Sequence, residues 1–316
     1  MKGRYGIATN NIDPNSISTI EVLENHQDIK ALKDLKPEER ASINLKLKSG
    51  VKGVFNLIAT LGGGYVDKLL WDNELITTYF QRNSQLLATY KGNNSGTDLE
   101  SELRSHTDYD YSRTSTISDI AMPATPGINK RYYYFNQSHS ATYNQVFRVG
   151  KNGELGINAA YLNDRDERSN QSVTTTLLPD GSKNVVDESF NGILHRNIAN
   201  GNITYMQNTE RNYIKEQLKF DWLSTDGYSN IYAGEDIIQE NNVENYRLHN
   251  LFHLTSRTGS DKGVEFLSKI NLEKKPHSLS VAPNLFPDVI MSEQMFQSAE
   301  RRNISTENRL DFLSAI

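Results

Sequence analysis

Two histidines, His249 and His253, have a spacing that is common in helical metal sites. Side chains four residues apart share one face of a helix, where two imidazole rings can hold one Zn²⁺ ion. On a strand the same spacing leaves them on one face but about 13 Å apart, too far to share a metal. Neighbouring residues alternate between apolar and polar, so we expect a strand and predict that both histidines line a wet interior.

The segment 163–168 carries three acidic side chains, Asp164, Asp166 and Glu167, whose oxygens are ligands of the kind that Ca²⁺ prefers. It lacks the glycine and the downstream glutamate of an EF-hand loop, and Arg165 and Arg168 interrupt the acidic run. The sequence therefore predicts a solvated loop tip here, without a calcium site.

Three glycines follow one another at residues 62–64, but neither the lysine of a phosphate-binding loop nor the spacing of a dinucleotide turn accompanies them. They predict a strand end or a kink in a barrel wall. No serine, histidine and aspartate stand in a nucleophile-elbow context, and the chain has no cysteine for thiol catalysis or metal binding. We therefore predict no catalytic, cofactor-binding or metal-binding residue, and we expect that the protein is not an enzyme.

Composition excludes further classes of function. The chain has 316 residues and a net charge of −5, which provides no basic patch for nucleic acid. No run of 18 apolar residues is present, so a transmembrane helix is not expected. A membrane-spanning strand needs only about ten residues with every second one apolar, so polar composition is compatible with a transmembrane β-barrel.

Alternation of apolar and polar residues dominates the chain after residue 50. Its clearest example is the run 246–255, where Tyr246, Leu248 and Phe252 alternate with polar residues. The run 264–273 repeats this pattern, and the whole region predicts about ten antiparallel strands. Such an apolar face packs against a second sheet in a soluble sandwich and against lipid in a barrel, and alternation alone does not separate the two.

The connections between the expected strands favour the barrel. Short links near residues 83, 151, 210 and 259 alternate with long polar links, which we place near residues 95–127, 164–190, 228–243 and 282–299. Outer-membrane barrels have short periplasmic turns and long extracellular loops. We expect the segment 163–182 to form an extracellular hairpin standing above the membrane.

The segment 17–50 reads as a strand, a short helix over residues 24–35 and a second strand over residues 43–47, that is, a compact β-α-β unit ending at Gly50. Its motifs, I-E-V-L at residues 20–23 and A-S-I-N-L-K-L-K at residues 41–48, resemble the end of the plug domain of TonB-dependent outer-membrane receptors, particularly those of the Bacteroidetes. The resemblance covers about 35 residues. It predicts a plug remnant over residues 1–50 and the first part of a transmembrane barrel over residues 51–316.

The resemblance implies active uptake of a nutrient (siderophore, vitamin, glycan or peptide) across the cell outer membrane. It implies as partners the nutrient, outer-membrane lipid, a possible surface lipoprotein, and the TonB complex through an upstream segment. The start of the chain, Met1 to Gly6, has no apolar signal-peptide region. We therefore expect a fragment of a longer receptor that is not functional alone.

The residues leave ligand contacts unassigned, but loops 92–127 and 164–190 are the places where we expect them. The alternative hypothesis is a soluble or surface-attached β-rich protein of binding or adhesion, in which the apolar faces of two sheets pair.

Overall fold

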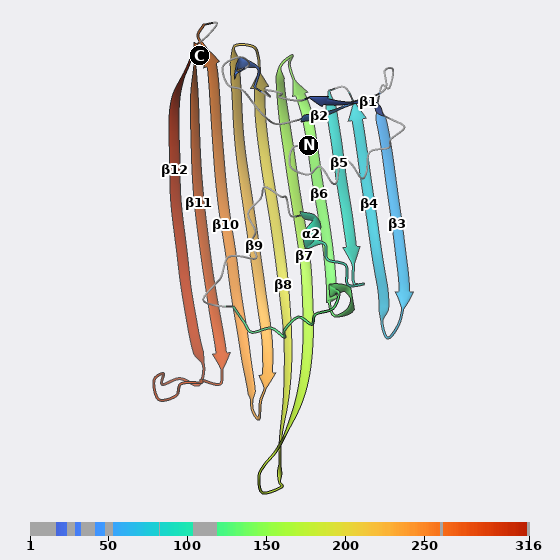
Figure 1. The fold of residues 1–316 in the computed structure, drawn as a ribbon, viewed down its shortest axis with the longest axis vertical. Helices are drawn as coiled ribbons and strands as arrows, with labels where there is room; N and C mark the ends of the chain where they lie inside the picture. The colour runs from blue at the N-terminus through green and yellow to red at the C-terminus, as the bar shows by residue number, and fades with distance from the viewer. Residues whose placement is uncertain are drawn as a thin grey trace.

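The structure is a computed structural model. It describes residues 17–23, 29–32, 42–47, 53–81, 83–103, 119–259 and 262–314. It is mainly β. Ten strands form one antiparallel sheet in which each strand pairs with its neighbours in sequence, in the order β12 to β3 (Figure 1). The ten-stranded antiparallel architecture predicted from alternation is confirmed.

The first four strands are 10–15 residues long, and the other six are 20–26 residues long. Their bounds are β3 Val54–Tyr65, β4 Leu69–Gln81, β5 Ser84–Asn93, β6 Phe135–Val149, β7 Gly153–Leu177, β8 Lys183–Asn208, β9 Asn212–Tyr232, β10 Asp236–Arg257, β11 Lys262–Ala282 and β12 Met295–Ser314. The glycines at residues 62–64 lie inside β3 near its end, as predicted.

The connections agree with the predicted rhythm at one end of the sheet and agree in part at the other. Short links occur at 82–83, 150–152, 209–211 and 258–261, as predicted. At the opposite end the link 94–134 is long and contains α2 (Glu100–Leu103) and η4 (Lys130–Tyr132). The link 283–294 at this end is also long.

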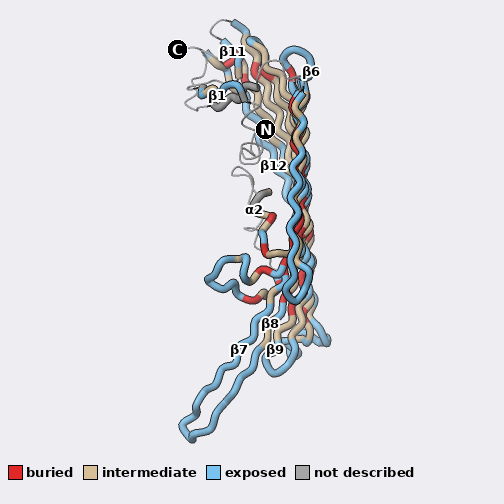
Figure 2. Tube along the Cα trace, turned by 90° about the vertical axis from the view of Figure 1, so that its right-hand side faces the viewer, coloured by how far each residue is buried: buried red, intermediate tan, exposed pale blue. Residues whose placement is uncertain are grey.

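The predictions of long links at 164–190 and 228–243 are wrong. Strands β7 and β8 are joined by residues 178–182, and β9 and β10 by residues 233–235. Polar residues occur on both faces of these segments, so the alternation that marks a strand in the sequence disappears while the backbone remains paired. The β7–β8 pair does project beyond the rest of the sheet as a two-stranded ribbon, which matches the expected hairpin (Figure 2).

A second, two-stranded sheet precedes the large one. It contains β1 (Ile17–Leu23) and β2 (Ser42–Leu47), and the short helix η2 (Lys30–Leu32) lies between them in sequence. The two strands pair antiparallel, with Val22 opposite Ile43. The β-α-β prediction is therefore wrong, since that unit requires parallel strands; the pattern of apolar residues carries no information on the direction of the second strand. Most of the predicted helix 24–35 and the boundary at Gly50 lie outside the described residues.

Candidate functional site: the polar face and its folded-back loop

Across β8–β12 the register of the large sheet separates polar from apolar side chains. Directly paired residues on neighbouring strands point to the same side of a sheet. One row across β8–β12 consists of Gly201, Phe220, Leu248, Leu272 and Ile304, and the adjacent row, on the other side, consists of Asn202, Lys219, His249, Asn271 and Ser305. We call the side of the polar row the inner face and the side of the apolar row the outer face.

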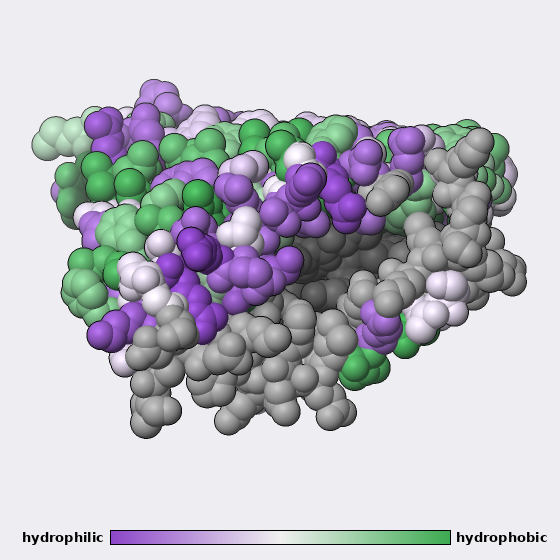
Figure 3. All heavy atoms as spheres, turned by 90° about the horizontal axis from the view of Figure 1, so that it is seen from above, coloured by the Kyte–Doolittle hydropathy of each residue, from purple (hydrophilic) through white to green (hydrophobic). Residues whose placement is uncertain are grey.

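The outer face is exposed although it is apolar. On β8 and β9, Ile203 is 51% exposed, Leu218 43% and Phe220 44%. Figure 3, seen from the end with the short turns, shows the sheet as a curved wall with hydrophobic residues along its outer side and hydrophilic residues around its hollow. The arrangement is the reverse of a water-soluble sheet, which buries its apolar face.

The inner face, by contrast, carries parts of the chain from outside the sheet. Strand β1, helix α2 and the described parts of the link 94–134 all lie on one side of the sheet (Figure 2). We call this link, of which residues 94–103 and 119–134 are described, the β5–β6 loop. In the first described part of this loop, Leu99 packs on Leu162 of β7 and Ile198 of β8, and all three side chains are buried.

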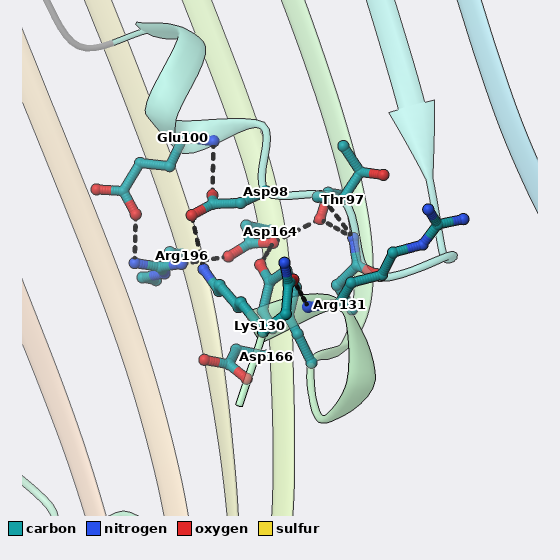
Figure 4. A network of polar contacts seen from close by, with 12 residues as sticks. Thr97, Asp98, Glu100, Lys130, Arg131, Asp164, Asp166 and Arg196 are labelled. Carbon is teal, nitrogen blue, oxygen red and sulfur yellow. Dashed lines mark hydrogen bonds and ion pairs between the residues drawn. The ribbon is translucent and has the colours of Figure 1, made fainter. Parts of the chain in front are cut away.

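An ion-pair network holds the same part of the loop beside this apolar contact (Figure 4). The guanidinium of Arg196 on β8 bonds to Glu100 of α2 at 2.7 Å and to Asp164 of β7. The hydroxyls of Tyr134 and Ser138 each donate to Asp164 at 2.6 Å. Asp164 is 2% exposed, so its charge is compensated by one cation and two neutral donors.

Lys130 forms a second ion pair within the loop. Its ammonium lies 2.7 Å from the carboxylate of Asp98 and 4.1 Å from the centre of the Tyr134 ring. Burial raises the pKa of Asp98, but the hydrogen bond and charge of Lys130, with the backbone N–H of Glu100, outweigh burial and lower the pKa below its ordinary value. Burial and the negative charge of Asp164 raise the pKa of Tyr134, so this phenol remains a hydrogen-bond donor.

Two amide side chains fix the turn where the loop leaves the sheet. Asn136 accepts from the backbone N–H of Gly96 at 2.9 Å and donates to Asn93 at 2.8 Å. Gly96 has a φ of +87°, and a Cβ there would lie 2.7 Å from the carbonyl oxygen of Arg131. Only glycine therefore suits this close approach of the two ends of the loop.

The second described part of the loop crosses β8 and β9 over two glycines. A Cβ at Gly192 would lie 2.4 Å from the sulfur of Met122, and one at Gly227 would lie 2.7 Å from Ile120. The N–H of Ala121 donates to the side chain of Gln239 on β10 at 2.7 Å. The loop is thus anchored to five strands, from β6 to β10, on the inner face.

The residues singled out from the sequence are placed on strands. Asp164 and Asp166 lie on the inner face, each 2% exposed, whereas Glu167 points outward and pairs with Arg165 at 3.0 Å. The prediction of a solvated loop tip is wrong for the two aspartates, because strand alternation buries them against Arg196 and Arg168. The acidic triplet therefore does not converge on one point.

His249 and His253 lie on the same face of strand β10, as predicted for this spacing on a strand; this is the inner face, and the two have different partners. The ring of His249 contacts Asn271, and Nε2 of His253 lies 2.7 Å from Glu265. No group of three or more histidine, aspartate or glutamate residues in the described ranges has metal-binding geometry.

The short-turn end of the inner face contacts the segment before the sheet. Ala31 and Leu32 of η2 are buried, and the backbone N–H of Lys30 donates to Asn208 of β8 at 3.0 Å. Next to this contact is an open depression of about 460 Å³, lined by Lys30, Asn152, Thr209, Glu210, Arg211 and Asn212.

No protein-family model matches the chain, and a search of curated proteins found no match. In the described part of the chain, none of the helical segments has the length and apolar character of a membrane-spanning helix.

The network joins the two segments in which ligand contacts were expected, since Asp98 and Glu100 belong to 92–127 and Asp164 to 164–190. Sequence reasoning missed Arg196, Lys130 and Tyr134, which connect them. Each is a single basic or aromatic residue among polar neighbours in the sequence, and such a residue does not indicate by itself that it belongs to a site. Because the charges drawn together here are paired with one another, the arrangement is suited to positioning a loop rather than to covalent chemistry.

Proposed function

We propose that the ten-stranded sheet forms part of the wall of an outer-membrane β-barrel, in a receptor of the TonB-dependent type that takes up a nutrient. The observation that carries the proposal is the exposed apolar outer face opposite a polar inner face that the chain itself covers. A bilayer solvates the first, and a wet lumen solvates the second.

The height of the apolar band supports this proposal. On β9 the outward residues from Ile214 to Trp222 span nine positions, and the next outward residues are Ser224 and Asp226. A tilted membrane-spanning strand needs about 9–11 residues. Trp222 pairs with Tyr246 at the end of the band that is farther from the short turns. Aromatic girdles of barrels lie at such limits of the apolar band.

One ionisable residue interrupts the band on β9. Glu216 points outward near the short-turn end, and Asn250 of β10 donates a hydrogen bond to it. A carboxylate is tolerated better near the membrane interface than at its centre, and a partner lowers the cost further. The pair is therefore compatible with a position close to the periplasmic interface.

The two edge strands of the sheet need further strand partners in a membrane. Strands β3 and β12 each pair on one side only among the described residues. Unpaired strand edges are strongly unfavourable in lipid. The proposal therefore requires additional strands, from the same polypeptide or another, to complete the barrel.

Transport is proposed from what occupies the inner face. Helix η2 contacts it at the short-turn, periplasmic end, as expected for the remnant of a plug, and the β5–β6 loop covers its other half. In receptors of the resembled type, a plug moved through TonB opens the path for a bound nutrient. Ligand contacts are proposed on the loop and on the β7–β8 ribbon.

The soluble alternative requires a second sheet against the outer face. The described ranges place none there, and the covering segments lie on the polar face instead. The membrane proposal therefore accounts for the sidedness of this sheet better than a sandwich does.

The chain has no cysteine, so single cysteines can test the two faces. Leu248→Cys and His249→Cys are neighbours on β10 that point to opposite faces. After spin labelling in lipid vesicles, we expect the label at 248 to collide mainly with oxygen, which dissolves in lipid, and the label at 249 to collide mainly with a water-soluble nickel complex. Equal access of the nickel complex to both positions would refute the membrane proposal.

A further inference from the structure

The β7–β8 ribbon has two free edges, and they differ in charge. Pairing of β6 with β7 stops at Phe135 and Glu167, so β7 has no partner on that side from Arg168 to Leu177 among the described residues. Pairing of β8 with β9 begins at Ser189, which leaves residues 183–188 of β8 as the other edge. The ribbon stands clear of the sheet and is exposed on all sides (Figure 2).

The β7 edge lacks every usual protection against strand addition. Residues 169–178 read S-N-Q-S-V-T-T-T-L-L, without charge, proline or glycine. Pairing with β8 is continuous over this stretch, without a bulge. Natural edge strands are normally blunted by charges, prolines or bulges, because their free N–H and C=O groups accept another strand.

The β8 edge carries that protection. Three of the six residues from 183 to 188 are charged, namely Lys183, Asp187 and Glu188. The contrast within one ribbon indicates which edge is open. Val173 and Leu177, 60% and 70% exposed, point to the same face of the ribbon as Val185, which is 57% exposed.

We propose that the β7 edge, residues 169–177, binds an extended segment of a partner polypeptide, which adds to the ribbon as a third strand. Main-chain hydrogen bonds supply the affinity in this mode, and alternate side chains supply the specificity. The partner segment is uncharged over its paired length, with an apolar side chain at every second position to cover Val173 and Leu177. This inference rests on the ribbon and does not depend on membrane insertion.

The test uses the full chain in detergent micelles and a fluorescent peptide that copies residues 170–177 of β7, N-Q-S-V-T-T-T-L, which is uncharged and carries its valine and leucine on one face when extended. We expect saturable binding, with protection of the β7 amides from hydrogen exchange. Thr174→Lys with Thr176→Lys should weaken binding at least about tenfold, because charges blunt an edge. The control, Val186→Lys with Asn184→Lys, places the same charges on the same face at the directly paired positions of β8, and should leave binding within about twofold of wild type.

A second reagent separates loss of the edge from loosening of the ribbon. The same peptide with alternate amides methylated cannot form the ladder on one edge, and its binding to the unchanged protein should be lost. Three results would overturn the proposal: no saturable binding up to about 1 mM, equal weakening by both variant pairs, or undiminished binding of the methylated peptide.

Discussion

Leu218 offers a direct test of the solvent at the outer face. It lies four residues from Ile214, where the apolar band of β9 begins, which at about 3.4 Å per residue is about 14 Å along the strand. With a strand tilt of about 40°, this corresponds to about 10 Å along the membrane normal, near the middle of an apolar band of about 25 Å. Leu218→Arg therefore places a guanidinium close to the bilayer midplane.

The expected loss of stability follows from that depth. A basic residue on the lipid face of a barrel at the midplane destabilises it by about 2–4 kcal/mol. If water covers the outer face, Leu218 is a 43% exposed surface residue, and its replacement changes the free energy of unfolding by only about 0.5–1 kcal/mol. The loss in free energy of unfolding is therefore expected to be larger if lipid covers the outer face than if water covers it, and a measurement can separate the two cases.

Gln217→Arg is the matched control, since it adds the same charge one residue away on the inner face. Gln217 donates one hydrogen bond to Asn202 at 3.1 Å, so the control should cost about 1 kcal/mol or less.

The free energy of unfolding would be measured by urea titration in lipid vesicles. The two tryptophans of the chain, Trp71 and Trp222, both lie on the outer face and report on unfolding through fluorescence. Equal and small losses for Leu218→Arg and Gln217→Arg would refute a lipid-covered outer face.

The other predictions concern the β5–β6 loop and use proteolysis within residues 94–134 as the measurement. Arg196→Met leaves a buried carboxylate without its cation, which should destabilise the anchored loop by about 3–5 kcal/mol and accelerate cleavage; unchanged cleavage would contradict the anchoring role. Gly192→Val should also accelerate cleavage, because its side chain occupies the place of Met122, whereas Gly201→Val on the same strand meets nothing within 4 Å and should not. Asp98 has a lowered pKa, so its contribution is present above pH 3.8, its ordinary value, and is lost as the pH falls through the lower folded value. Asp98→Asn should therefore be cleaved faster than wild type at pH 6, and the difference should disappear in acid, where a persisting difference would contradict the ion pair.

The strands of the large sheet were predictable wherever one face carries apolar side chains and the other polar ones. Leu248 and His249 illustrate this, since apolar and polar residues alternate only if one side is wet and the other is not. The prediction failed at residues 164–190 and 228–243, where both faces carry polar residues and the pattern disappears. Strand pairing there continues because the backbone ladder needs no apolar side.

The polar network was not predictable from the sequence, because register decides which charges meet. Asp164 and Arg196 are 32 residues apart in sequence and become direct neighbours through the pairing of β7 with β8. A register shift by one residue would place Arg196 on the outer face, among apolar side chains. The network thus contributes to fixing the register as well as the loop.

The inner face explains why a polar loop folds back onto the sheet. A sheet whose outer side is apolar must place its charged residues inward, where Asp164 and Arg196 are largely removed from water once the loop covers them. A buried charge is tolerated only when it is paired. Glu100 and Tyr134 of the loop complete the pairing that the strands leave unfinished. The loop and the wall therefore stabilise each other, and a change to either should be detected first in the other.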